Sequence, residues 1–582
     1  MCDSGAKMLS DSIKELVRKY AAKNAFDYGK ANEGSVFNKV LSKAPEAKSD
    51  MQGLRTLVKQ TVEAINQMDV ASLKELYAKY GAEFEAEDKA KAERTAKPKM
   101  ELEGAEEGSF AARFPPEPSG YMHLGHTKQL FLSQEFSRIY KGRLFLYFDD
   151  TNPKKEKQEF VDAYKADLAW LGVNFDEEYY ASDNIEKVYD LCRQMIADGN
   201  AYACSCTSEE IKNGRFSGIA CVHRSAAPEQ NMDLFNQMLA GKYDEDQIII
   251  RLKGDMSSQN TTMRDPTIMR VVKAPHYRQG TKYIVWPTYF LNTPIMDSLH
   301  GVTDVLRSKE YEQSEEMYEH VLKSLKMRVP RVHAFSRLRI LNNVTQKREI
   351  RAMIDSGTLS GFDDPRLITI AALRRRGITP QAIRDFVLRA GMSKMDTSID
   401  LSALLAENKR VIDQTSKRLF FVQNPVKVNI SGDLPKRVEL PLHPTNTQLG
   451  SRAYDIDGTV YISATDAQGL KPGDALRLKN LSAITITGVS DGSIDAAAAQ
   501  GGSAAQVVQW VPGNSYAKCR VTIPMDLLDK DGKLNKDSLK LVDGYIESYA
   551  STLNEHEAVQ LERFGFCVLD KKEPLEFIFI SK

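Results

Sequence analysis

The stretch of residues 113–152 limits the fold of this chain more than any other part of the sequence. It reads RFPPEPSGYMHLGHTKQLFLSQEFSRIYKGRLFLYFDDTN. Three prolines near its start exclude a helix there, because proline fixes φ and lacks a backbone N–H. Apolar residues then recur at helical spacing, and residues 143–148 form a strand-like apolar run. Together with the strand-like residues 110–114, this order predicts half of a nucleotide-binding α/β fold.

Two histidines mark the point where the turn enters the predicted helix. His123 and His126 lie at a helix N-terminus, where free N–H groups and the macrodipole favour anions. Gly125 between them has no side chain, so a flat nucleobase can approach the backbone closely. Two histidines at a helix start are, taken alone, more often capping or core residues than ligands. The surrounding sequence therefore has to decide between these interpretations.

That surrounding sequence resembles the signature of the class I aminoacyl-tRNA synthetases, with HLGH at the place of their HIGH box. The match is to the glutamyl/glutaminyl branch, whose members carry RFPPEPSGYLH-type turns and an FDDTNP-type strand end, here residues 148–153. The resemblance extends with gaps from about Ser109 to the C-terminus. It implies a Rossmann-type catalytic domain that uses ATP and Mg²⁺ to attach an amino acid to tRNA.

Length and composition agree with a large globular protein of several domains. The chain has 582 residues, 42% hydrophobic and 27% charged, and no apolar run of the roughly 18 residues that a membrane helix needs. The N-terminus lacks the apolar core of a secretory signal. Seven cysteines do not resemble a disulfide framework in a chain this long, so we expect a reducing compartment and a cytoplasmic location.

The charge balance argues against recognition of nucleic acid by global attraction. Lysine plus arginine and aspartate plus glutamate number 79 each, for a formal net charge of zero. A local basic face stays open. Arg366 and residues 374–376 are candidates for phosphate contact with tRNA, and a solvated basic helix end is the alternative. In the C-terminal part, Arg437, Arg477 and Arg520 are candidates for contact with unstacked anticodon bases.

Changes in texture along the chain predict a multidomain protein with α/β, α and β parts. The family assigns an inserted domain to the tRNA acceptor end, a helical domain to the tRNA stem and two C-terminal β-barrels to the anticodon. The predicted boundaries are an N-terminal helical module at 1–95, a linker at 96–108, the first Rossmann half at 109–180, the insertion at 181–280, the second half at 281–345, the helical domain at 346–414 and the barrels at 415–582.

The two ends of the chain predict different kinds of domain. The N-terminal module has helical apolar stripes and no histidine, so we interpret it as a docking or RNA-contact module. Beyond about Thr415, short strand-like segments alternate with turn residues, as in barrels or sandwiches. Two barrels resemble the archaeal/eukaryotic glutamyl and the glutaminyl enzymes. The Ala-, Gly- and Ser-rich residues 488–502 predict a loop.

A cluster of soft ligands lies inside the predicted insertion. Cys204, Cys206, Cys221 and His223 form two close pairs, and such pairs can close a tetrahedral zinc site. The single-residue spacers are tighter than usual, and a set of reduced structural cysteines is the alternative. Some glutamyl-tRNA synthetases are similar here, which favours a structural zinc ion.

Activation of an amino acid requires its carboxylate to attack the α-phosphate of ATP, so positioning and electrostatic stabilisation supply the rate. The resemblance gives ATP contacts to His123, Gly125 and His126 and, from the family's mobile KMSKS loop, to Lys347. Residues 344–348 read VTQKR, and only Lys347 matches, whereas relatives usually keep LSKRK or MSKR. This departure puts efficient use of ATP in question.

The amino-acid pocket of the family matches four positions. A substrate with two carboxylates and one ammonium needs two cationic donors and one carboxylate. Arg113 and Arg307 are the cations, Asp149 is the ammonium partner and Tyr289 is a further hydrogen-bond donor. Arg307 favours the glutamyl over the glutaminyl enzymes. Glutamyl enzymes carry arginine at this position, whereas glutaminyl enzymes carry a small neutral residue.

The sequence therefore predicts an enzyme of the glutamyl branch that charges tRNA(Glu) with L-glutamate through glutamyl-adenylate. Whether tRNA(Gln) is a second acceptor stays open. One alternative is a glutaminyl enzyme, which Arg307 disfavours. The other is a tRNA-binding scaffold without catalysis, which the altered loop at Lys347 motivates.

Overall fold

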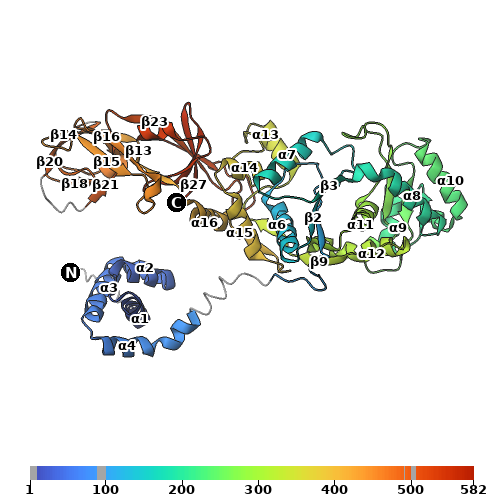
Figure 1. Ribbon diagram of the computed structural model, residues 1–582, viewed down its shortest axis with the longest axis horizontal. Coiled ribbons are helices and arrows are strands. Elements are labelled where there is room, and N and C mark those ends of the chain that lie inside the picture. Colours follow the sequence, from blue (N-terminus) through green and yellow to red (C-terminus); the bar gives the residue numbers. More distant parts are fainter. Residues whose placement is uncertain (1–9, 88–99, 491, 500–505) are drawn as a thin grey trace, which may run out of the picture. The chain divides into compact units, whose positions relative to one another are not determined.

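The computed structural model describes residues 10–87, 100–490, 492–499 and 506–582 (Figure 1). The chain divides into two compact units, Met1–Lys97 and Pro98–Lys582. The first unit is helical, as its apolar stripes predicted, and Val17, Val40 and Leu54 are fully buried in its core. Asn32, Asp50 and Asp69 cap helix N-termini with side-chain oxygens. Its helices are α1 (Asp11–Tyr28), α2 (Glu33–Lys43), α3 (Met51–Asn66) and α4 (Val70–Lys79), with a 3₁₀ turn at Pro45–Asp50.

The second unit begins with an apolar anchor. Leu102 is buried, and its amide donates to the Tyr140 hydroxyl at 2.9 Å. The amide of Gly108 donates to the Tyr140 carbonyl at 2.8 Å. Residues 102–108, the end of the predicted linker, therefore pack against the rest of the second unit, because Leu102 is buried there.

A parallel sheet then forms as the opening stretch predicted. Its strand order is β1-β2-β3, with Ala111 opposite Arg143 and Phe145 opposite Glu177. Gly142 turns the chain where a side chain would meet the Phe110 carbonyl, so only glycine fits that turn. The elements are β1 (Ala111–Phe114), α6 (Leu124–Ile139), β2 (Arg143–Phe148), α7 (Gln158–Trp170) and β3 (Glu177–Tyr180).

The inserted segment builds a four-stranded antiparallel sheet in the order β4-β5-β6-β7. Helices pack against it around the fully buried Trp286 and Phe235. The elements are α8 (Ile185–Ala197), β4 (Ala201–Cys204), α9 (Ser208–Ser217), α10 (Pro228–Leu239), β5 (Ile249–Leu252), β6 (Thr267–Val271) and β7 (Val285–Pro287).

A second parallel pair, β8 and β9, follows the insertion and lies beside β1. The amide of Thr303 donates to the Ala111 carbonyl at 2.8 Å, and the Ala111 amide donates to the Thr303 hydroxyl at 2.7 Å. The C-terminal ends of β1 and β8 therefore open at one edge. The elements are α11 (Tyr289–Leu299), β8 (Asp304–Ser308), α12 (Glu315–Ser324) and β9 (Arg331–Phe335).

Helices connect this region to the C-terminal sheets. The short strands β10 and β11 pair in parallel. The C-terminus lies beside α16 (Figure 1). The Lys409 ammonium of this helix donates to the carbonyl of Lys582 at 2.9 Å. The elements are β10 (Leu338–Ile340), α13 (Lys347–Asp355), α14 (Ile370–Arg375), α15 (Pro380–Ala390), β11 (Thr397–Ile399) and α16 (Leu401–Ile412).

Two seven-stranded, barrel-like sheets form the C-terminal part. One has the order β12-β25-β26-β27-β23-β24-β13 and the other β21-β18-β19-β20-β14-β17-β22. The strands of the first are β12 (Lys417–Leu419), β13 (Phe421–Gln423), β23 (Tyr516–Pro524), β24 (Leu539–Glu547), β25 (Ala558–Leu561), β26 (Gly565–Lys571) and β27 (Leu575–Ser581). Those of the second are β14 (Pro425–Ser431), β17 (Thr459–Ser463), β18 (Ala475–Leu478), β19 (Ser482–Ser490), β20 (Ser493–Ala499), β21 (Gln506–Val508) and β22 (Val511–Pro512), beside a hairpin of β15 (Arg437–Pro441) and β16 (Ser451–Asp455).

The prediction of a loop at residues 488–502 is wrong for Ser493–Ala499, which form β20. This strand pairs antiparallel with β19 and parallel with β14. Its alanines have weak intrinsic strand preference, but Ala496 is buried between the two neighbours, so sheet pairing overrides local preference. Among the helices of the described residues, none combines the length and apolar character needed to cross a membrane.

Candidate functional site

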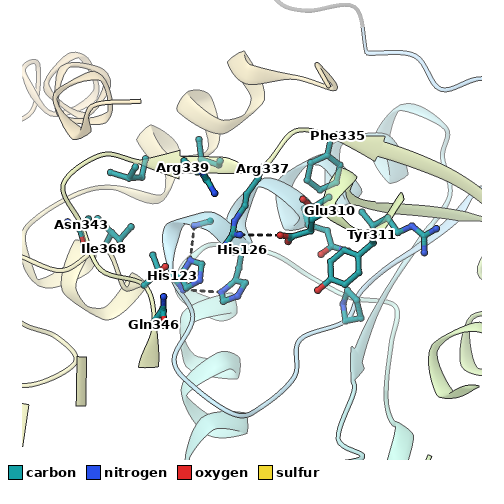
Figure 2. A pocket seen from close by; sticks show the side chains of 18 of the residues that line it. His123, His126, Glu310, Tyr311, Phe335, Arg337, Arg339, Asn343, Gln346 and Ile368 are labelled. Carbon is teal, nitrogen blue, oxygen red and sulfur yellow. Dashed lines mark hydrogen bonds and ion pairs between the residues drawn. The ribbon is translucent and has the colours of Figure 1, made fainter. Parts of the chain in front are cut away.

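A cavity of about 770 Å³ opens at the edge where β1, β2 and β8 end (Figure 2). It is bordered by the histidine turn on one side and by residues 335–346 on another. Seven of the eight substrate- and ATP-contact residues that the sequence suggested line it, although they come from five separate segments of the chain. They are Arg113, His123, Gly125, His126, Asp149, Tyr289 and Arg307.

The two histidines fix each other's ring orientation. His123 is the N-cap of α6, and its Nδ1 accepts from the Gly125 amide at 3.0 Å. His126 Nδ1 accepts from the His123 amide at 3.2 Å, and the ring centroids lie 3.8 Å apart. Because each Nδ1 accepts a backbone proton, each neutral ring carries its own proton on Nε2. Both rings are therefore set to act as donors.

Burial keeps this pair uncharged at neutral pH. Desolvation, followed by the positive charge of Arg337, lowers the pKa of His123 to about 4. Desolvation lowers the pKa of His126 well below its usual value. Gly125 is required here, since a Cβ would lie 2.8 Å from Cε1 of His123. The turn thus presents two neutral N–H donors beside an open backbone.

Arg113 lies at the floor of the cavity and is held by a buried carboxylate. Its Nε and one terminal nitrogen donate to Asp297 at 2.9 and 3.1 Å, and both side chains are almost fully buried. The Tyr318 hydroxyl donates to the same carboxylate at 3.0 Å. Only the remaining terminal nitrogen, 3.5 Å from the Leu306 carbonyl, is left to meet a ligand.

Arg307 has more free donor capacity than Arg113. It lies in β8, is 5% exposed, and one of its buried terminal nitrogens has no hydrogen-bond partner. The same nitrogen lies 3.6 Å from a carboxylate oxygen of Glu315, which makes an ion pair but is too long for a hydrogen bond. Its guanidinium carbon lies 5.4 Å from the centre of the Tyr318 ring. Tyr318 therefore contacts Arg307 and also donates to Asp297, the carboxylate that holds Arg113. A buried, unmatched guanidinium donor fits an anionic ligand group.

Asp149 follows β2 and lines the same cavity as these arginines. Asn292 donates to one carboxylate oxygen at 2.8 Å, and the Thr293 hydroxyl lies 3.4 Å from the other. Desolvation, and then the negative charge of Glu117, raise the pKa of Asp149 to about 6. Burial raises the pKa of Tyr289, whose ring lies 5.5 Å from that of Tyr311, to about 12. This part of the cavity therefore combines the guanidinium groups of Arg113 and Arg307 with the carboxylate of Asp149 and the protonated phenol of Tyr289.

Lys347 is the suggested residue that does not line the cavity. It begins α13, its ammonium donates to the Ser119 carbonyl, and it lies 4.0 Å from the centre of the Phe160 ring. Gln346 and Thr345 line the cavity in its place. The position of Lys347 in the sequence gave no indication of this orientation.

Sequence reasoning missed other residues that line the cavity, and also Asp297, which holds the cavity residue Arg113. Asp297 had a usable signal, because a single acid in the apolar run of α11 is costly to bury without a partner. Arg337 and Arg339 also line the cavity, and their i, i+2 spacing places both on one side of an extended segment. Figure 2 shows them beside the histidine turn, with Glu310 and Tyr311 further along the cavity.

The four predicted metal ligands meet in the insertion. Their ligand atoms all lie within 4.8 Å of one another. The sulfur atoms of Cys204 and Cys221 are 3.8 Å apart, and Cys206 Sγ is 3.4 Å from His223 Nδ1. A tetrahedral Zn²⁺ with Zn–S bonds of about 2.3 Å places its sulfur ligands about 3.8 Å apart, so the residues fit this ion.

Polar neighbours surround the same cluster. The Ser205 hydroxyl lies 3.0 Å from His223 Nε2, which leaves Nδ1 facing the cysteines. Arg251 is 2% exposed and points one terminal nitrogen at Cys221 Sγ, 3.7 Å away. With Zn²⁺ bound to three thiolates, the charge of Arg251 would offset the net negative charge of the cluster.

Two of the suggested tRNA-contacting arginines are buried, and this prediction is wrong for them. Arg366 is held by both oxygens of Asp364 and by the Ser538 hydroxyl. Arg376 is 5% exposed. Arg375 forms a two-bond pair with Asp570 of the last sheet, at 2.9 Å for each bond. These side chains hold the helices against the C-terminal sheets, and Arg374, with a 41% exposed side chain, stays available.

Comparison with known proteins agrees with this geometry. Residues 109–414 match the family of class I tRNA synthetases (E and Q), catalytic domain, and residues 416–500 and 507–570 match the anticodon-binding domains of the same class. The chain belongs to the class I tRNA synthetases of the glutamate and glutamine group, which confirms the resemblance seen in the sequence.

Two individual relatives of this chain are named for glutamate. The chain is 35% identical to the glutamate–tRNA ligase of Korarchaeum cryptofilum, over 98% of this chain and 99% of that protein. It is 35% identical to that of Nitrosopumilus maritimus, over 98% and 100%. A crystal structure of glutamate–tRNA synthetase from Elizabethkingia anophelis shares 17% identity and a TM-score of 0.40, covering 53% of this chain and 71% of that one.

Proposed function

We propose that this protein is a glutamate–tRNA ligase, which activates L-glutamate with ATP and transfers it to the terminal ribose of tRNA(Glu). The observation that carries this proposal is the one cavity that Arg113, Arg307 and Asp149 line together. A dianionic amino acid has one ammonium and two carboxylates, and this donor set complements each of them. The relatives named glutamate–tRNA ligase support the same reaction.

The residues divide the chemistry by position. The free nitrogens of Arg307 and Arg113 bind the two carboxylates, and Asp149 binds the ammonium. His123 and His126 donate from Nε2 to the phosphates while the glutamate carboxylate attacks the α-phosphate, releasing pyrophosphate and forming glutamyl-adenylate. Neutral donors already fixed by the backbone need no rearrangement as charge develops on the phosphoryl oxygens. A bound Mg²⁺ ion would supply further positive charge against the phosphates.

The domain roles follow the same proposal. The sheets β1–β3 and β8–β9 act as one Rossmann-type nucleotide fold, with the cavity where the strand order reverses. Residues 181–280 bind the acceptor end, and residues 346–414 bind the stem. Residues 415–582 bind the anticodon, and the module at 1–95 contacts protein or RNA. Zn²⁺ held by Cys204, Cys206, Cys221 and His223 stabilises the acceptor-binding insertion.

Two other candidate functions make different predictions. A glutaminyl enzyme would leave the unmatched nitrogen of Arg307 opposite a neutral amide. A scaffold without catalysis would bind tRNA but not charge it. Incubation of the purified chain with ATP, Mg²⁺, separated tRNA acceptors and labelled glutamate or glutamine distinguishes the three. Glutamyl-tRNA(Glu) is the expected product; glutaminyl-tRNA, or binding without charging, would refute the proposal. Product on tRNA(Gln) would define a second acceptor.

A further inference from the structure

The arginines that line the cavity differ in whether an acid already neutralises them. Four arginines and no lysine line it among the described residues. Three have a carboxylate oxygen within 4.0 Å, and Arg339 has none in the described part of the chain. The three pairs are Arg113–Asp297 at 2.9 Å, Arg307–Glu315 at 3.6 Å and Arg337–Glu310 at 3.1 Å. Among the described residues, Arg339 is thus the cavity arginine that forms no ion pair within 4.0 Å. Asp396 acts on its charge only from a longer distance and is itself paired with Lys309 at 2.9 Å.

Arg339 is attached to a fixed part of the cavity wall. It is the central residue of β10 and is paired with Ser398 of β11, which also lines the cavity. The preceding residue, Leu338, is buried, and its carbonyl oxygen lies 3.8 Å from the position of a Cβ on Gly125. The strand therefore passes directly beside the histidine turn, as Figure 2 shows for the labelled Arg339 and His123.

The segment that follows β10 places no lysine in the cavity. Lys347, the lysine expected to follow the phosphates, is bonded to the Ser119 carbonyl and packed on Phe160. Thr345 and Gln346, which do line the cavity, are uncharged. On the wall beside the histidines, the cation that forms no ion pair within 4.0 Å among the described residues is therefore Arg339 on β10, and not a residue of the loop.

We infer that Arg339 binds the phosphate chain of ATP and supplies the positive charge that the altered loop lacks. This inference rests on the proposed function of the cavity. A guanidinium is always charged and can donate two parallel hydrogen bonds to a phosphate. An arginine without an acidic partner loses no ion pair when it does so. Its strand position means that the charge is in place before the nucleotide arrives.

Calorimetric titration of the full chain with Mg²⁺-ATP and with adenosine tests this inference, and needs no charging activity. Arg339→Gln removes the charge but keeps hydrogen-bonding capacity, and Arg339→Ala removes both. We expect the Kd for Mg²⁺-ATP to rise about tenfold to a hundredfold in both variants, as for loss of a charge-assisted bond. The Kd for adenosine should change less than about twofold, since adenosine has no phosphate.

The control is Arg328→Ala, at an exposed arginine outside the cavity, which should leave both constants unchanged. Arg339→Lys should recover part of the affinity for Mg²⁺-ATP. Equal weakening of ATP and adenosine, or no weakening of ATP in either variant, would overturn the assignment. Absence of glutamate charging by the unaltered protein would instead refute the proposed function, so the two failures are separable.

Discussion

Arg113 and Asp297 form a buried two-bond ion pair, although 184 positions separate them in the chain. The pair joins β1 to α11 across the whole insertion and also fixes Tyr318. Both carboxylate oxygens are occupied, so Arg113 is oriented before any substrate binds. Arg113 therefore connects the two halves of the fold and also lines the cavity proposed to bind the amino acid.

Removal of Asp297 should be strongly destabilising. Asp297→Ala leaves the Arg113 charge buried without its partner, which typically costs about 3–5 kcal/mol. We expect the catalytic unit to unfold at a clearly lower temperature, which calorimetry or circular dichroism would measure. Asp455→Ala, which breaks the exposed pair with Arg437, is the control and should unfold almost as the unaltered protein does. Equal melting temperatures for the two variants would contradict the assigned role of the buried pair.

The use of glutamate should fall as the pH drops through about 6. Asp149 must be ionised to bind the substrate ammonium, and its pKa is raised to about 6 by burial and by Glu117. Below that pH the free enzyme holds the neutral acid, so kcat/KM for glutamate declines about tenfold per pH unit. His123, with a pKa of about 4, stays neutral throughout this range.

The pH profile of kcat/KM for labelled glutamate, measured between pH 5 and 8 with saturating ATP and tRNA, checks this expectation. Glu117→Gln removes the neighbouring negative charge and should shift the acidic limb to lower pH. A limb that stays in place in this variant, or a flat profile, would argue against Asp149 as the titrating group.

Metal analysis should find about one zinc ion per chain, as four ligands at tetrahedral spacing imply. Cys204→Ser should lower zinc occupancy sharply and should destabilise the insertion. The control is Cys519→Ala, at a buried cysteine in β23 outside the cluster, which should keep its zinc. A metal-free and fully active protein would rule out the structural role.

Tyr277 should affect glutamate binding from a distance. Its hydroxyl donates at 2.8 Å to Asp150, whose carboxylate also accepts two bonds from Ser182. Asp150 is adjacent to Asp149, so Tyr277→Phe should loosen the end of β2 and raise the KM for glutamate severalfold, with little change in the KM for ATP. Tyr243→Phe, in the same insertion, is the matched control. Parallel changes in both KM values would indicate general destabilisation instead.

The sequence predicted best those features whose residues lie close together in the chain. The turn with His123 and His126 was predictable, because its prolines, glycine and helix stripe are adjacent in the chain. The Cys204–His223 cluster was predictable from spacing alone. The Arg113–Asp297 pair was not, since it joins distant segments. Arg366 and Arg376 were misjudged, because their burial arises from packing of the helices on the C-terminal sheets.

The central claim is that two guanidinium groups make this cavity select an acid at both ends of its substrate. The most direct measurement is the ratio of kcat/KM for glutamate and glutamine in tRNA charging, compared between the unaltered protein and Arg307→Cys. Loss of the unmatched buried guanidinium should lower kcat/KM for glutamate by about a hundredfold or more and leave the weak use of glutamine almost unchanged. An unchanged ratio would contradict the account and would show that selectivity lies elsewhere in the chain.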